Sequence, residues 1–119
     1  MEAFMAFGKV KLSDEALETV AVLFRSLGET SRLKILRLLE EKEMTVNELA
    51  ASIKTSQANV SKHLKMLINA GVLSRRAQGT AAYYSIADPM ILKICDTICN
   101  GMTERVKIQA AGFGLKLKK

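Results

Sequence analysis

The chain has 119 residues, a formal net charge of +6 and 49% apolar residues. This length suits one domain with a single core and excludes two domains of ordinary size. No apolar run approaches the roughly 20 residues that span a bilayer, which excludes a membrane-spanning protein and favours a cytoplasmic one. The basic excess suits an anionic partner, either nucleic acid or a membrane surface.

Two helices are predicted in the first third of the chain. From Asp14 the apolar residues Leu17, Val20 and Phe24 recur at helical spacing, and Gly28 ends the segment. The next segment, around residues 33–39, has an unusually broad apolar stripe. Such a stripe predicts a helix in the middle of the core.

A pair of helices joined by a short break is predicted at about residues 45–70. Thr45 and Glu48 match a capping box, and apolar residues then follow at helical spacing. The break Lys54-Thr55-Ser56 offers Thr55 or Ser56 as the cap of the second helix, which Gly71 ends. Two helices with a tight turn, the second presenting a polar face, match the helix-turn-helix plan.

The polar face of that second helix carries the candidate DNA-binding residues, and it contains no acidic side chain. The start of such a helix meets base edges in the major groove, which short donors and acceptors can read. Because Gln and Asn can bond adenine in bidentate fashion, a site containing A·T pairs is favoured. The base-reading candidates are Ser56, Gln57, Asn59 and Ser61, and the candidates for flanking phosphates are Lys62, His63 and Lys65.

A β-hairpin and a last helix complete the predicted order. Residues 72–76 and 81–86 resemble two short strands, and the link 77–80 contains glycine where a hairpin needs an unusual backbone angle. Asp88 and Pro89 then open a helix that extends to about residue 108. We therefore predict a mainly α fold with a small β-hairpin, a winged helix-turn-helix. The wing, about residues 72–86, offers Arg75, Arg76, Gln78, Gly79 and Thr80 to the DNA backbone or minor groove.

The first and last helices, about residues 14–27 and 88–108, carry more apolar residues than one small core needs. They could be intramolecular core, but we expect them to form a homodimer interface. The interface candidates are Leu17, Val20, Phe24, Ile91, Ile94, Cys95, Ile98 and Met102.

Cys95 and Cys99 are the candidate thiol ligands, because residues four apart share a helix face. A symmetric dimer would bring four thiols together, which could bind a soft metal or respond to oxidants. The alternative is that both are small apolar side chains in the dimer seam, and this is favoured because no basic neighbour activates them. One histidine, His63, cannot complete a tetrahedral site. Neither a metal nor a cofactor is expected.

The stretch 27–86 resembles the ArsR/SmtB group of winged-helix repressors. The resemblance is carried by LGETSRLKILRLL, SQANVSKHLKMLINAGVL and RRAQGTAAYYSI. It implies a homodimer through the first and last helices and an operator that is released when an effector binds. By position, it places Gln57, Asn59, Ser61, Lys62 and His63 on the recognition helix. Arg75, Arg76 and Gly79 fall on the wing.

Three departures from the family pattern bear on metal sensing and on the wing. Metal-sensing members carry Cys-x-Cys where this chain has Thr45-Val46-Asn47, and others place histidines in the last helix, which has none here. The wing has Thr80 and Ala81 where a basic or aromatic residue often follows the glycine. The first two departures argue against metal sensing, and the third concerns only how strongly the wing binds.

The sequence thus predicts a DNA-binding transcriptional regulator, a repressor that acts as a homodimer on an inverted-repeat operator. Two alternatives stay open: a thiol or soft-metal sensor that uses Cys95 and Cys99, and a protein-interaction module that kept the shape without binding DNA. The acid-free face of residues 56–65 argues against the second. An enzyme is not expected, since there is no paired acid and base, phosphate loop or nucleophile–histidine arrangement.

Overall fold

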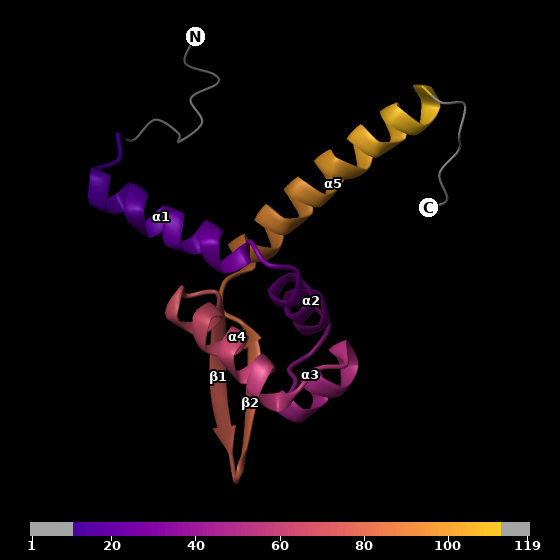
Figure 1. Cartoon of the computed structure of the whole chain (residues 1–119). Coiled ribbons are helices and arrows are strands. Elements are labelled where there is room, and N and C mark those ends of the chain that lie inside the picture. The colour runs from indigo at the N-terminus through magenta and orange to yellow at the C-terminus, as the bar shows by residue number, and fades with distance from the viewer. Residues whose placement is uncertain (1–10, 113–119) are drawn as a thin grey trace. The chain divides into compact units, whose positions relative to one another are not determined.

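The computed structural model describes residues 11–112, which fall into two compact units. The first unit ends at Ala87 and the second begins at Asp88. The elements of the first unit are α1 (Asp14–Leu27), α2 (Thr30–Leu39), α3 (Val46–Ile53), α4 (Gln57–Asn69), β1 (Leu73–Gln78) and β2 (Ala81–Ile86) (Figure 1). The second unit consists of α5 (Pro89–Gly112). The expected mainly α fold with one hairpin is confirmed, whereas the grouping of all 119 residues into a single domain stays a prediction.

Side chains just before the helices fix where the helices begin. Ser13 caps α1 by accepting a hydrogen bond from the backbone N–H of Ala16. The predicted capping box is present at α3: the Glu48 N–H donates to Thr45 Oγ1 at 3.2 Å, and the Thr45 N–H donates to Glu48 Oε1 at 2.9 Å. At α5, the Met90 N–H donates to Asp88 Oδ1 at 2.9 Å, with Pro89 as first helical residue. These starts follow from local sequence alone.

The core of the first unit lies between α2, α3, α4 and the start of the hairpin. Six of its side chains are less than 2% exposed: Ile35, Leu49, Val60, Leu64, Leu67 and Val72. Because three of them come from α4, that helix is held by its inner stripe. Its opposite side is thereby left facing outward.

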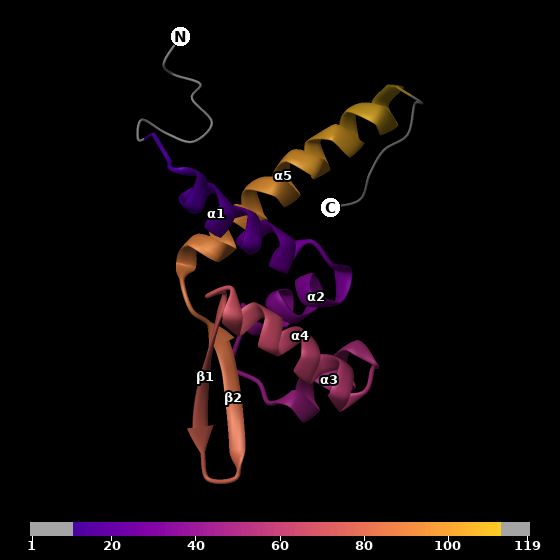
Figure 2. The same cartoon turned by 60° about the vertical axis from the view of Figure 1, so that its left-hand side comes forward.

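The hairpin is tighter than the sequence suggested. β1 and β2 pair antiparallel from Leu73 opposite Ile86 to Gln78 opposite Ala81, so only Gly79 and Thr80 lie between the strands. Gly79 has φ 62°, the left-handed conformation that a two-residue hairpin turn requires. At the base, Tyr84 and Met44 exchange backbone hydrogen bonds. In both views the hairpin projects beyond the helices of its own unit (Figures 1 and 2).

Candidate nucleic-acid interface

The outward side of α4 presents short polar and basic side chains. Gln57, Ser61, Lys62 and Lys65 are all exposed. Gln57, Ser61 and Lys65 follow one another at intervals of four, and Lys62 lies in the adjoining row, so the four share one helix face. The structure therefore brings together four of the seven residues that the sequence proposed on this helix.

The turn before α4 sets the direction in which this face points. Lys54 has the left-handed conformation, with φ 57°, and the Thr55 N–H donates to the carbonyl oxygen of Ala50 at 3.1 Å. Lys54 therefore caps the end of α3, and Ser56, two residues later, caps the start of α4. As a result, Gln57 and Ala58 at the start of α4 are exposed shortly after the end of α3.

Ser56 and Asn59, two of the proposed base readers, are engaged within the protein. Ser56 Oγ accepts a hydrogen bond from the Asn59 N–H at 3.1 Å and so caps α4. Asn59 is half-buried, and its Nδ2 donates to Thr55 Oγ1 at 3.1 Å. Both side chains thus stabilise the turn, while Gln57 and Ser61 remain the more accessible candidates for base contacts.

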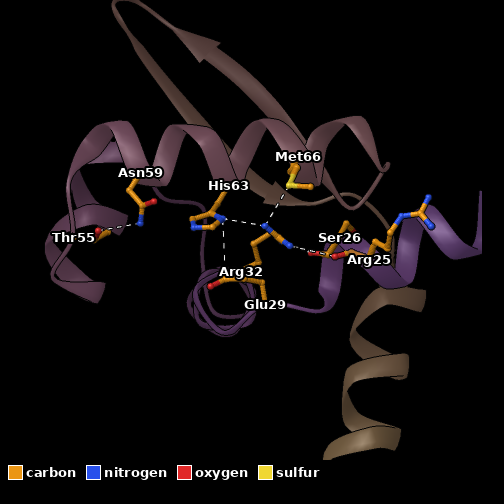
Figure 3. A network of polar contacts seen from close by, with 8 residues as sticks. All are labelled: Arg25, Ser26, Glu29, Arg32, Thr55, Asn59, His63 and Met66. Carbon is orange, nitrogen blue, oxygen red and sulfur yellow. Dashed lines mark hydrogen bonds and ion pairs between the residues drawn. The ribbon is translucent and has the colours of Figure 1, made fainter.

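His63 lies on the inner side of α4 and does not belong to the exposed face. It is 6% exposed, and its Nδ1 lies 3.2 Å from Arg32 Nη1 (Figure 3). Its burial argues against the phosphate contact proposed from the sequence and favours a structural role for His63. The periodicity could have indicated this, because His63 is three residues after Val60 and four before Leu67, both of which are buried.

The two arginines of β1 have different surroundings, because neighbouring residues of a strand point to opposite faces. Arg76 donates to both carboxylate oxygens of Glu43, at 3.2 and 2.9 Å, and lies 4.9 Å from the ring centre of Tyr83. This pairing holds the pKa of Glu43 below and the pKa of Arg76 above its ordinary value. Sequence reasoning did not identify Glu43 as the partner of Arg76. Arg75 is exposed.

The wing tip and the charge balance around it favour an anionic ligand. Gln78, Gly79 and Thr80 are all exposed, although Gln78 accepts a hydrogen bond from Arg76. From residue 49 to residue 87, which covers α4 and the hairpin, the sequence has five Lys or Arg and no Asp or Glu. A basic stretch of this kind, presented on one helix and one hairpin, matches the electrostatic pattern of nucleic-acid binding.

Apolar side chains are exposed on α1 and, separately, on α5. On α1, Leu17 is 39% and Phe24 52% exposed, and Val20 is half-buried. On α5, Ile98 is 53% and Met102 48% exposed, whereas Ile91 is buried. The remaining interface candidates, Ile94 and Cys95, are half-buried.

The thiol candidates lie on α5, where Cys95 is half-buried and Cys99 is exposed. Within residues 11–112, no group of three or more His, Cys, Asp or Glu side chains lies close enough to hold a metal ion. Among the same residues, no helix is both long and apolar enough to cross a membrane.

Comparison with known proteins identifies the family. Residues 29–75 match the family model described as bacterial regulatory protein, arsR family. An uncharacterised HTH-type transcriptional regulator of Methanocaldococcus jannaschii is 36% identical over 81 residues, which are 67% of this chain and 91% of that protein. A transcriptional repressor SmtB homologue of Synechocystis is 29% identical over 78% of this chain and 70% of that protein.

Solved structures show the same fold. The crystal structure of Rv0081 from Mycobacterium tuberculosis matches with a TM-score of 0.74 and 29% identity, over 82% of this chain and 99% of that one. A homodimeric winged helix-turn-helix DNA-binding domain from Mycobacterium bovis matches with a TM-score of 0.74 and 26% identity, over 83% of this chain and 94% of that one. The chain therefore belongs to the arsR family of bacterial regulatory proteins, transcriptional regulators with a winged helix-turn-helix.

Proposed function

We propose that this chain is a sequence-specific repressor that binds double-stranded DNA as a homodimer in the cytoplasm and catalyses no reaction. The observation that carries the proposal is the outward face of α4, where Gln57, Ser61, Lys62 and Lys65 are exposed and no carboxylate is present. Such a face fits the major groove, whose edges offer donors and acceptors between two rows of phosphates.

The exposed side chains of α4 and the wing contact different parts of the DNA, according to their chemistry. Gln57 and Ser61 contact base edges and carry the sequence preference, since an amide can bond adenine at two positions. Lys62 and Lys65 contact phosphates, which strengthens binding to every duplex and makes it depend on salt. Arg75 and the wing tip at Gln78, Gly79 and Thr80 reach the neighbouring backbone or minor groove.

A homodimer is supported by the apolar side chains that the single chain leaves uncovered. Leu17 and Phe24 of α1 are one such group, and Ile98 and Met102 of α5 are another. Exposed apolar groups of this kind mark interaction surfaces. The related domain from Mycobacterium bovis is described as homodimeric. A two-fold dimer would place two copies of α4 in successive major grooves, roughly 34 Å apart, on an inverted repeat.

The proposal is tested by selecting bound duplexes from a random pool with the wild type and two variants. We expect the wild type to enrich an inverted repeat. Gln57→Ala should flatten the preference at one position of each half-site, because a bidentate contact discriminates by about 1–3 kcal/mol. Lys62→Ala should keep the preference and weaken binding to all duplexes alike.

Arg37→Ala serves as the control for charge, since Arg37 is exposed on α2, outside the proposed face. It should leave both the preference and the affinity close to those of the wild type. An unchanged selection profile for Gln57→Ala would contradict the assignment of α4 as the recognition helix. Failure to enrich any duplex would contradict DNA binding itself and favour a protein-interaction module.

A further inference from the structure

Arg32 of α2 joins the end of α1 to the inner side of α4. Its side chain is 8% exposed and uses all three nitrogens. Nε donates to the Ser26 carbonyl oxygen at 2.6 Å and Nη2 to the Arg25 carbonyl oxygen at 3.2 Å, both at the C-terminal end of α1. Nη1 faces His63 Nδ1 at 3.2 Å and Met66 Sδ at 3.3 Å, both on α4 (Figure 3). One guanidinium therefore contacts both helices.

The contact with His63 requires the neutral ring. Arginine is always protonated and can only donate hydrogen bonds, so the Nδ1 that faces it must accept. The neutral imidazole then carries its proton on Nε2. A second proton on Nδ1 would point one donor at another and place two positive charges side by side.

Glu29 offers the protonated ring a different partner. Glu29 Oε2 lies 3.8 Å from His63 Nδ1. The same oxygen accepts a hydrogen bond from the backbone N–H of Arg32, so that Glu29 caps the start of α2. Partial burial raises the pKa of the Glu29 carboxyl, but the backbone N–H groups of Arg32 and Ser31, together with electrostatic attraction from His63 and Arg32, hold it below its ordinary value. The carboxylate is therefore charged at neutral pH and can attract a proton on Nδ1.

Apart from Arg32 and Glu29, the charged side chains on α1, α2, α3 and β1, the elements that pack against α4, are exposed. Several of them are paired with one another. Glu18 and Arg25 of α1 form an ion pair, and Figure 3 shows the Arg25 guanidinium turned away from His63. Glu48 of α3 binds its own capping residue, and Arg76 of β1 binds Glu43. Asp14, Glu15, Lys34, Arg37 and Arg75 are exposed as well. Arg32 and Glu29 are thus the charged groups in direct reach of His63.

We infer that Arg32 and His63 are positioning residues for DNA binding: together they set the proposed recognition helix α4 relative to α1, and protonation of His63 weakens that link. The inference rests on the proposed function of α4. Neutral His63 accepts from Arg32 and keeps α4 tied to α1. Protonated His63 donates to Glu29 instead, so Arg32 keeps only the weaker contact with Met66 Sδ on α4, and α4 can shift. DNA affinity then falls on acidification, although added positive charge by itself would raise it.

His63 is the only histidine of the chain, which makes the effect measurable. Histidine is the side chain that ordinarily changes charge between about pH 5 and 8. We would measure the affinity for a duplex recovered by selection, at about pH 7.5 and at about pH 5.5. The wild type should bind roughly tenfold more weakly at the lower pH, the size expected for one lost hydrogen bond to a charged group.

Two substitutions separate positioning from general stability. His63→Asn keeps an acceptor near the position of Nδ1 and cannot be protonated, so its affinity should not fall between the two pH values. Arg32→Lys keeps the positive charge but loses the branched guanidinium that contacts both helices. This variant should therefore bind the duplex roughly tenfold more weakly than the wild type at pH 7.5. Arg37→Lys, the same change at an exposed position of α2, should bind like the wild type. Far-UV circular dichroism confirms that each protein is folded at each pH.

A second measurement needs no DNA. Amide NMR shifts of the DNA-free protein are followed while the pH is lowered. We expect residues at the end of α1 and along α4 to shift together in the wild type and to stay constant in His63→Asn. Shifts confined to the immediate neighbours of His63, or the same pH dependence of DNA affinity in both proteins, would overturn the inference. If the coupled shifts occur but no duplex binds, the link between α1 and α4 stands and the proposed function is wrong.

Discussion

Arg75 and Arg76 carry the same charge but have different surroundings. Arg75 and Arg76 follow each other on β1, yet only Arg76 binds Glu43 and lies over Tyr83. The free energy of such an exposed ion pair is small, but its two hydrogen bonds fix the direction of the guanidinium. Arg75, which is exposed, is therefore the better candidate to neutralise a phosphate.

The salt dependence of DNA binding distinguishes the two arginines. Arg75→Ala should reduce the slope of log affinity against log salt by about 0.9, the value for one phosphate contact. Arg76→Ala should change that slope by less, because its charge is already compensated by Glu43. Both variants would be compared with the wild type by fluorescence anisotropy on one duplex across a range of salt concentrations. Equal losses of slope would show that Glu43 releases Arg76 when DNA binds.

Sequence patterns identified the exposed residues of the candidate site better than the buried ones. The absence of acids and the helical spacing sufficed to place Lys62 and Lys65 on an outward face, and Gln57 and Ser61 were proposed from their position near the start of the helix. Asn59, expected on the same face, is half-buried. The role of His63 depends on Arg32, which lies 31 residues earlier in the chain. Likewise, Arg76 meets Glu43 across 33 residues. Contacts of this range arise only once the helices have packed, so local patterns do not reveal them.

The stability of a short helix depends strongly on the capping of its ends, because few of its backbone groups form hydrogen bonds within the helix. α3 has eight residues, and its first turn is stabilised by the reciprocal bonds between Thr45 and Glu48. Since α3 precedes the turn that begins α4, a frayed α3 would also loosen the start of α4.

Removing this cap should therefore destabilise the fold measurably. Thr45→Ala should lower the free energy of unfolding by about 1 kcal/mol, the usual cost of losing an N-cap hydroxyl. Ser52→Ala is the matched control: it removes a hydroxyl from an exposed position inside α3, where alanine is the better helix former. Urea denaturation would measure both. If the two variants had equal stability, the capping box would contribute nothing.

The same local signals explain how well the element boundaries were predicted. α1 ends just before Gly28 and α5 begins at Pro89, as expected, because caps and breakers act within a few residues. The hairpin differed: Ala77 and Gln78, expected in the link, belong to β1 because they pair with Ala82 and Ala81. Strand length depends on the register of two segments, which composition does not specify.

A single copy of the chain leaves apolar side chains of α1 and α5 exposed to water. The apolar groups of α1 and α5 exceed what the single chain buries, and the sequence already indicated this excess. Apolar residues on α5 recur at intervals of four: Ile98, Met102 and Val106 are 53%, 48% and 44% exposed. Such a stripe is stable in water when a second surface covers it.

A charge placed in the stripe should therefore dissociate the proposed dimer. Ile98→Glu should sediment as a monomer at concentrations at which the wild type is dimeric, because burial of an unpaired carboxylate is strongly unfavourable. It should also bind an inverted repeat much more weakly, since the two half-sites are no longer bound together. Asn100→Glu adds the same charge at an exposed polar position of α5 and should remain dimeric. A dimeric Ile98→Glu would place the interface elsewhere.

The outward face of α4 is the surface on which the proposed function depends, and amide NMR shifts upon addition of a selected duplex would show whether DNA lies there. We expect the largest changes at Gln57, Ser61, Lys62 and Lys65, with smaller ones at Arg75 and the wing tip, all diminishing as salt is raised. Changes confined to other surfaces, with these α4 amides unaffected while the duplex is bound, would contradict the assignment.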